Sequence, residues 1–199
     1  PKLRALKAAA VVEEGIDLLV LGEMGIGNST SAAALSARSF GGTAAEWVGP
    51  GTGLDATGVS RKTLVIDRAL AFHAAAPAGA FETFCRVGGR ELAAIAGAVL
   101  AARHARVPVL LDGFISSASI APLAAQNPKI AHHCLAGHCS TEPGHARLLA
   151  RLGLDPLLSL GMRLGEGSGA AVAASIVRAA LAAHDGMATF AEAAVSNRG

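Results

Sequence analysis

The stretch Gly161–Ala171, which reads GMRLGEGSGAA, decides how this chain folds. It follows a short apolar run at 156–160 and opens an apolar helical stretch at 170–183. A strand, a glycine-rich turn and a helix start together expose backbone N–H groups to an anion. Because four glycines surround Glu166 in this turn, a ligand can approach the backbone closely. We therefore predict that Glu166 does proton chemistry beside a bound phosphate ester.

A second corner of this kind lies earlier in the chain. The apolar run 17–21 predicts a short buried strand. The glycine-rich turn Gly22–Ser29 (GEMGIGNS) follows, before an alanine-rich helix that we expect to reach about Ser39. Ser29 or Thr30 is the expected cap of that helix.

This corner differs from a P-loop by one residue. Gly22, Gly27 and Ser29 fit the P-loop spacing, but Asn28 stands where the lysine belongs. Without that lysine, no side chain of the loop reaches the outer phosphates of a triphosphate, so we expect a monophosphate or another small anion. The alternative is a turn that only links strand to helix. Glu23 is either a site carboxylate at the carboxyl end of a strand, where α/β folds gather ligands, or a solvated loop residue.

The segment 49–53 (GPGTG) is a further glycine cluster that suits close backbone approach to a ligand. The segment 60–76 reads as a helix with Arg61 and Lys62 in its first turn. Basic residues at a helix start oppose the helix dipole, and a bound anion removes that conflict. Lys62 is therefore either a phosphate partner or an exposed lysine.

Two more corners are predicted downstream. The buried strand 107–111 ends at Asp112, which either orients a ligand hydroxyl or hydrogen-bonds a turn. Gly137–Ser140 is expected to be the next corner, with Ser140 and backbone amides at the mouth of a helix. The other expected elements are helices over 2–14, 91–104, 116–126, 142–152 and 187–195, and a connector over 77–89.

The histidine-rich stretch 132–145 raises the question of a metal site. In a strand, His132 and Cys134 face one way and His133 the other, so their ligand atoms do not converge. The CxxC and HxxxH spacings of well-known zinc sites are also absent. We predict no metal here, and no nucleophilic pair of Cys139 with His138, since adjacent residues seldom point together.

Composition narrows the class of protein. The chain has 199 residues, of which 52% are hydrophobic and 16% charged, which argues for one globular domain and against disorder. A net charge of +2 without a Lys/Arg stripe argues against nucleic-acid binding. No apolar run reaches the roughly 18 residues of a membrane span, and no signal peptide opens the chain. Three cysteines are an odd number and do not suggest a framework of disulfides. We therefore expect the protein to reside in a reducing compartment, the cytoplasm.

Repeated strand–helix units predict an α/β fold with a mostly parallel sheet and helices on both faces, in three layers. One site can then assemble at the carboxyl edge of the strands, where the corners meet. These corners are 22–28, 49–53, 112–113, 137–140 and 161–169.

Four motifs in this order resemble the nicotinate-nucleotide–dimethylbenzimidazole phosphoribosyltransferase family. They are GEMGIGNSTSAA at 22–33, the loop Gly49–Asp55, GGRE at 88–91 and RLGEGSGA at 163–170. The resemblance runs over essentially the whole chain and implies a Rossmann-like domain in a homodimer, with no metal and no cofactor. It implies transfer of phosphoribose from nicotinate mononucleotide to 5,6-dimethylbenzimidazole, which gives α-ribazole 5′-phosphate and nicotinate with inversion at the anomeric carbon.

By the same motifs, Glu166 matches the general base of the family and Glu23 a second active-site carboxylate. In the resulting reaction, benzimidazole loses its ring proton to Glu166. We expect an apolar, glycine-lined site to raise the pKa of this carboxylate by desolvation. The residues expected around the nucleotide are Gly25, Gly27, Asn28, Gly51, Gly53, Lys62, Ser140 and Leu164.

Family members are longer at the N-terminus, and the chain resembles their C-terminal portion. We therefore expect residues 1–199 to be a single α/β domain without the N-terminal part of a small domain, and its terminal helices are candidates for that subdomain. One alternative is a nucleotide-dependent NTPase or dehydrogenase. The missing P-loop lysine and the missing GxGxxG after Leu21 argue against it. The other is a catalytically silent domain that folds, dimerises and binds phosphate.

Overall fold

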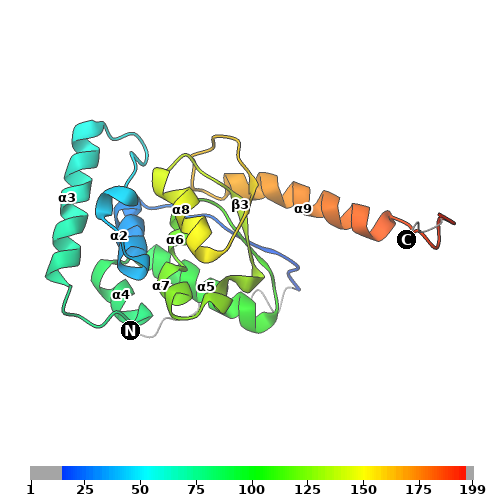
Figure 1. Ribbon diagram of the computed structural model, residues 1–199, viewed down its shortest axis with the longest axis horizontal. Coiled ribbons are helices and arrows are strands. Elements are labelled where there is room, and N and C mark those ends of the chain that lie inside the picture. The colour runs from blue at the N-terminus through cyan, green and yellow to red at the C-terminus, as the bar shows by residue number, and fades with distance from the viewer. Residues whose placement is uncertain (1–14, 196–199) are drawn as a thin grey trace.

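A parallel sheet lies at the centre of the molecule (Figure 1). The structure is a computed structural model and describes residues 15–195. Its elements in chain order are β1 (Leu19–Leu21), α2 (Asn28–Phe40), η1 (Ala44–Glu46), α3 (Ala56–Phe72), α4 (Ala80–Val87), α5 (Arg90–Ala105), β2 (Val109–Leu111), α6 (Phe114–Ala118), α7 (Ala121–Gln126), η2 (Pro128–His133), β3 (Cys134–His138), α8 (Pro143–Leu152), β4 (Pro156–Leu158) and α9 (Ser168–Gly186).

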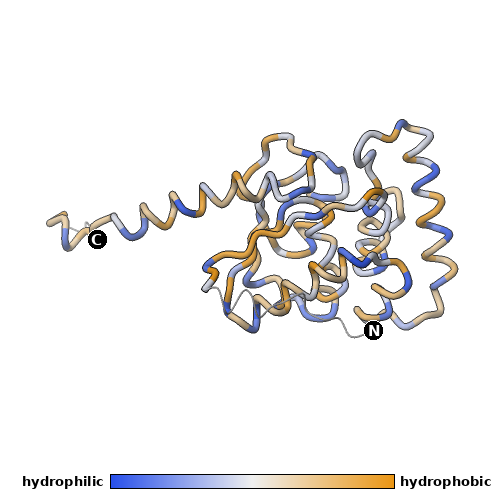
Figure 2. Tube along the Cα trace, turned by 180° about the vertical axis from the view of Figure 1, so that it is seen from behind, coloured by the Kyte–Doolittle hydropathy of each residue, from blue (hydrophilic) through white to orange (hydrophobic). Residues whose placement is uncertain are grey.

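The four strands lie in the order β1-β2-β3-β4, and every neighbouring pair is parallel. Figure 2 shows the strands as an apolar track through the middle of the molecule. The three residues of β2 are all fully buried. Such a short, uniformly apolar strand is typical of a parallel sheet that is covered on both faces.

The side chains of the central strand divide the core into two parts. Val109 and Leu111 belong to the large cluster that the sheet shares with the helices before α9. Leu110 points the other way and packs with Ala170 and Ala173 of α9. Helices therefore cover both faces of a parallel sheet, and the predicted three-layer α/β fold is confirmed.

The two helical layers are unequal in the part of the chain that the structure describes. One layer holds several helices, whereas α9 contacts all four strands from the other face. Only the first turns of α9 are buried, and the rest of the helix projects away from the sheet (Figure 1).

The start of α3 differs from the prediction. The helix begins at Ala56, not at Ser60, because Asp55 is an N-cap whose side chain accepts a hydrogen bond of 2.7 Å from the Gly58 amide. Lys62 therefore lies beyond the first turn, and the expected conflict with the helix dipole does not exist. α2 also has another cap than expected: Gly27, with φ +87°, takes the place of Ser29 or Thr30.

Three further segments correct the prediction. The expected connector 77–89 contains the helix α4, which begins after Gly79 and buries Thr83 and Val87. The expected helix 116–126 is two helices, α6 and α7, because Pro122 suits only the first turn of a new helix. The expected terminal helix 187–195 is a series of turns.

The other expected helices agree with the structure to within a few residues. These are α2, α5, α8 and α9, and the strands before the corners are also present. The expected helix 2–14 lies outside the described residues. No described helix is both long and apolar enough to cross a membrane.

Candidate active site

The carboxyl edge of the sheet brings the glycine-rich corners together, as predicted. The corners after β1 and β4 touch backbone to backbone: a Cβ on Gly22 would lie 2.1 Å from the Gly167 amide nitrogen. The Glu23 amide donates a 2.8 Å hydrogen bond to the Gly165 carbonyl. Because of these contacts, Glu23 and Glu166 lie on adjoining loops.

Glu23 is the half-buried carboxylate of this pair. Burial raises its pKa above the usual value, and the negative charges of Glu91, Asp112 and Glu166 raise it further. Asn28 opposes this shift, since its side-chain amide donates a short hydrogen bond to Oε2 of Glu23. The residue that replaces the P-loop lysine thus binds the Glu23 carboxylate. The solvated-loop interpretation of Glu23 is wrong.

Glu166 is exposed in this structure. The expectation that an apolar pocket desolvates this carboxylate is therefore wrong for the described residues, and the desolvated carboxylate is Glu23. Glu166 stands at the tip of its turn, between Gly165, which is pressed against the Glu23 carboxylate, and Gly167, whose φ of +83° lies in the left-handed region. Its position leaves the carboxylate open to a ligand above the loops.

Lys62 is buried, at 7% exposed, so the exposed-lysine interpretation is wrong. Its Nζ donates to Oγ of Ser29 at 2.9 Å and to the Gly49 carbonyl at 3.0 Å. Burial lowers the pKa of this amine, and Glu142 partly restores it. This buried ammonium lies beside Gly51, whose φ is +58°, and charged groups of this kind form strong hydrogen bonds with phosphate oxygens.

Two side chains from the other corners hold the 49–53 loop against the site. Oε1 of Glu142, the residue before α8, accepts a 2.8 Å hydrogen bond from the Gly51 amide. Arg163, from the corner after β4, donates to the Gly51 carbonyl at 3.1 Å. The loop does not follow a strand, yet these contacts bring it to the carboxyl edge.

Ser140 begins the corner after β3, and His145 of α8 fixes it. The Ser140 amide donates to Nδ1 of His145 at 2.9 Å, and its Oγ lies 3.0 Å from the same nitrogen. Nε2 of the ring lies 3.2 Å from Oγ of Ser117. Burial lowers the pKa of His145 to about 3, so the ring is neutral, with Nδ1 as acceptor and the proton on Nε2.

Asp112 binds a turn, which is one of the two roles that the sequence left open. Its two carboxylate oxygens accept hydrogen bonds from the amides of Gly167 and Ala170 at the start of α9. The remaining predicted residues lie around the same loops. Gly25 is against the Asn28 amide, Gly27 and Gly53 adopt positive φ, and Leu164 is exposed next to Gly165.

Sequence reasoning did not single out Glu142, His145 and Arg163 as site residues. Glu142 and Arg163 contact Gly51 from 91 and 112 residues away, so no local pattern indicates these contacts. His145 lies only five residues from Ser140, but its spacing alone does not indicate that it binds the Ser140 amide. The position of Glu142 directly before Pro143, at a predicted helix start, is the only signal that could have drawn attention to it.

The histidine-rich stretch does not form a strand throughout. His132 and His133 belong to η2, so the argument from side-chain alternation applies only from Cys134 onward. Among residues 15–195, no three His, Cys, Asp or Glu side chains are grouped to hold a metal ion.

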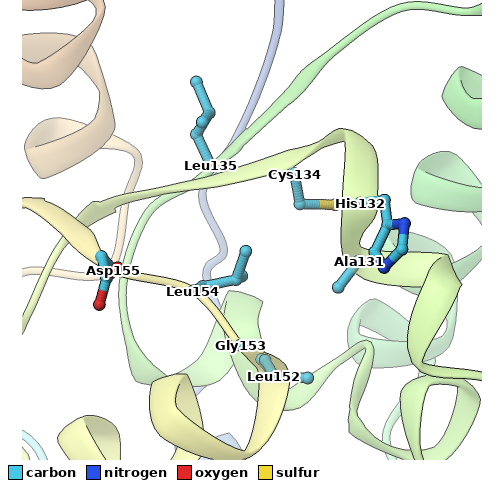
Figure 3. A pocket seen from close by; sticks show the side chains of 8 residues that line it. All are labelled: Ala131, His132, Cys134, Leu135, Leu152, Gly153, Leu154 and Asp155. Carbon is cyan, nitrogen blue, oxygen red and sulfur yellow. The ribbon is translucent and has the colours of Figure 1, made fainter.

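A cavity of about 370 Å³ lies at the start of β3 and β4 (Figure 3). Side chains that line it include Cys134, Leu135, Leu154 and Asp155. This is the amino edge of the sheet, opposite the glycine-rich corners. The cavity is therefore separate from the candidate active site.

The fold and these loops define a class: an α/β domain whose glycine-rich corners meet at one edge of a parallel sheet, beside a buried ammonium and two carboxylates on adjoining loops. A family model described as a phosphoribosyltransferase matches residues 4–195. The chain belongs to this phosphoribosyltransferase family.

Individual relatives agree with this assignment. The nicotinate-nucleotide–dimethylbenzimidazole phosphoribosyltransferase of Novosphingobium aromaticivorans is 69% identical over 98% of this chain and 58% of its own. The enzyme of the same name from Rhizobium meliloti is 56% identical over 92% of this chain and 54% of its own. The crystal structure of CobT from Thermus thermophilus superposes with a TM-score of 0.89 at 45% identity, over 96% of this chain and 57% of that one. The resemblance found in the motifs is confirmed. The chain spans a little more than half the length of these relatives.

Proposed function

We propose that this chain transfers phosphoribose from nicotinate mononucleotide to 5,6-dimethylbenzimidazole. One observation carries the proposal: a buried ammonium, Lys62, lies in the same assembly of glycine-rich loops as two adjoining carboxylates, Glu23 and Glu166. The cation and the loop amides suit the phosphate, and the carboxylates suit a base that loses a proton as it reacts. The names of the relatives support the same reaction.

The reaction balances with the residues of the site. One ring nitrogen of the benzimidazole attacks C1′, and the bond from C1′ to the nicotinate nitrogen breaks with inversion. The proton on the other ring nitrogen passes to the Glu166 carboxylate, a step that contributes about 10²–10⁴-fold to the rate of such reactions. Glu23, which Asn28 orients by a hydrogen bond, is the second carboxylate beside Glu166. Lys62, Gly51 and Ser140 hold the phosphoribosyl group and so position C1′.

The compartment and the oligomeric state are part of the same proposal. Cys85, Cys134 and Cys139 are free thiols, which fits a cytoplasmic, reducing compartment. We propose a pentosyltransferase that acts as a homodimer on small molecules, without metal, cofactor, nucleic acid or membrane as partner. Residues 1–199 are proposed to form a single catalytic α/β domain.

A second candidate is a domain that binds the nucleotide without turnover. The exposure of Glu166 favours it, because an exposed carboxylate lacks the desolvation that raises the pKa of a general base. In this case the loops and Lys62 still bind phosphate.

Product formation from nicotinate mononucleotide and dimethylbenzimidazole, followed by chromatography, separates the two candidates. We expect the chain to release nicotinate and form an α-linked nucleotide. Glu166→Gln should lose most turnover, about 10²-fold or more, and keep its affinity for nicotinate mononucleotide in calorimetry. Glu82→Gln, on α4 away from the loops, is the matched control.

Each outcome has a distinct meaning. Retained turnover in Glu166→Gln with several bases would remove Glu166 from the mechanism. Nucleotide binding without turnover in the unaltered chain would favour the silent domain. Neither binding nor turnover would overturn both candidates.

A further inference from the structure

Asp112 occupies a special place in the fold. It directly follows β2, a central strand, and the residue is 1% exposed. Oδ1 accepts a 2.7 Å hydrogen bond from the Ala170 amide, and Oδ2 accepts one of 3.1 Å from the Gly167 amide. The two donors lie one and four residues after Glu166, and both are more than fifty residues further along the chain than Asp112.

These hydrogen bonds provide acceptors for backbone N–H groups that find no acceptor within the helix. The first N–H groups of an α-helix have no intrahelical acceptor, and the positive end of the helix dipole favours a negative charge there. The N-cap of α9 is Gly167, which offers no side chain for this purpose. The carboxylate of Asp112 therefore acts as the cap of α9 from a neighbouring strand.

The side chains around Asp112 leave little room for the start of α9 to shift. Nε2 of His138, a fully buried side chain, lies 3.6 Å from Oδ1. The ring of His138 fills the space beside Gly169, where a Cβ would lie 2.2 Å from Cδ2. The start of α9 is thus held between Asp112 and His138 on the β2 and β3 side, and by Gly22 on the β1 side.

We propose that Asp112 is a positioning residue: its carboxylate fixes the Glu166 turn to the central strand. Its two oxygens bind the turn on the C-terminal side of Glu166, while the Glu23 amide binds Gly165 on the other side. Glu166 is thereby presented at one height above the sheet, although its own side chain is exposed. The effect of Asp112 on catalysis rests on the proposed function, but the fixing of the turn does not.

Amide hydrogen exchange tests the fixing directly. In the unaltered chain, we expect the Gly167 and Ala170 amides to exchange at least about tenfold more slowly than the Ser168 amide, which lies in the same turn. Asp112→Asn keeps the size of the side chain but turns an NH₂ group toward one of the two donors. We expect this variant to lose the protection of at least one amide. Asp67→Asn, on the exposed face of α3, is the control and should change neither.

Steady-state kinetics test the consequence for the reaction. Displacement of a catalytic group by about 1 Å can cost about 10²-fold in rate. We therefore expect Asp112→Asn to lower kcat by about that factor while KM for nicotinate mononucleotide stays within a few-fold of the unaltered chain. If Asp112 had a purely structural role, Asp112→Asn would reduce the amount of folded protein, and the folded fraction would not show a lowered kcat with an unchanged KM.

The outcomes separate this proposal from the proposed function. Rapid exchange of the Gly167 and Ala170 amides in the unaltered chain would overturn the proposal even if Asp112→Asn failed to fold. Protected amides in a chain without any turnover would uphold the fixing of the turn and count against the proposed function. A normal kcat in a folded Asp112→Asn with unprotected amides would show that the turn needs no such fixing.

Discussion

Lys62 is a buried cation whose neighbours only partly neutralise it. It donates to a hydroxyl and a carbonyl oxygen, and neither of these carries a formal charge. Glu142 is the negative group that raises its pKa, against the larger effect of burial. Holding an ammonium in this way costs stability, and such a cost is typical of a group kept for a ligand.

We predict that Lys62→Met weakens the binding of nicotinate mononucleotide by about 10- to 100-fold, which corresponds to the roughly 1.5–3 kcal/mol of one hydrogen bond to a charged group. The loss should be specific to the ligand that carries a phosphate, so the affinity for free dimethylbenzimidazole should not change. Titration calorimetry measures both. Lys129→Met, an exposed lysine in η2, is the matched control. Unchanged nucleotide binding in Lys62→Met would exclude Lys62 as a phosphate partner.

The raised pKa of Glu23 makes the stability of the fold depend on pH. The native state holds this proton more tightly than the unfolded chain, whose value is 4.5. Below pH 4.5 both states are protonated, and the contribution of Glu23 to stability is fully present. As the pH rises through the native pKa, the carboxylate ionises at a desolvated position and this contribution is lost.

Glu23→Gln, which cannot ionise, should therefore be more stable than the unaltered chain at pH 7.5. The gain should be about 1 kcal/mol or less, because the carboxylate is half exposed, and it should vanish toward pH 4.5. Urea midpoints at the two pH values measure it. The exposed-carboxylate variant Asp67→Asn should show no such trend. A Glu23→Gln variant that is less stable at pH 7.5 than at pH 4.5, relative to the parent, would reverse the sign and refute the argument.

At the residue level, the sequence predicted which residues lie near the carboxyl edge of the sheet better than it predicted their surroundings. Glu23 and Ser140 follow strands whose carboxyl ends meet at one edge of the sheet. Lys62 of α3 is joined to this edge by its hydrogen bonds to Ser29 and Gly49. Their protonation and burial depend on contacts such as Glu142 with Gly51, 91 residues apart. Such contacts follow from the packing of whole elements, and no local pattern encodes them.

At the level of elements, α9 lies close to the sheet because β3 carries a glycine at the contact. A Cβ on Gly137 would lie 3.0 Å from Cα of Ala170, which is itself fully buried. Small residues on both sides bring the helix axis close to the strand. The first turns of α9, and with them the Glu166 loop, depend on this approach.

Gly137→Ala should destabilise the fold by about 1–3 kcal/mol, the usual cost of an extra methyl group in a close-packed contact. It should also weaken the protection of the Ala170 amide, because the helix start must shift. Urea unfolding and amide exchange measure the two effects. Gly186→Ala, at the far end of the same helix with open space around its Cα, is the control and should be neutral or slightly stabilising. Equal stability of the two variants would contradict the close contact.

The sequence predicted elements well where hydrophobic periodicity was long, and poorly where helices were short. α5 was predicted to within a residue at each end, because its apolar side chains repeat over 16 residues. α4 has eight residues between Gly79 and Gly88, and such a short segment is helical only because its apolar face packs on the core. Residues 187–195 have a helical composition but stay exposed, so no packing stabilises a helix there.

At the level of the whole molecule, α9 exposes apolar side chains on its outer face. Val172 and Ile176, one turn apart on the same face, are 46% and 49% exposed. On the sheet, Val20 and Leu135 are also partly exposed. Apolar side chains grouped in this way are typical of a surface that another protein covers. The proposed homodimer supplies such a cover.

We predict that the chain self-associates through α9 and that Ile176→Glu weakens this association. Burying one such side chain is worth about 1.5–3 kcal/mol, and a charge at the same place costs more, so the dissociation constant should rise at least about tenfold. Sedimentation velocity over a range of concentrations measures it. Ser175→Glu adds the same charge one position away, about 100° around the helix, and should have a smaller effect. Because Ile176 lies two turns beyond the Glu166 loop, nucleotide affinity should stay unchanged in both variants. A chain that remains monomeric at every concentration would remove α9 as the dimer contact. A larger effect of Ser175→Glu would instead place the contact on the neighbouring face of the helix.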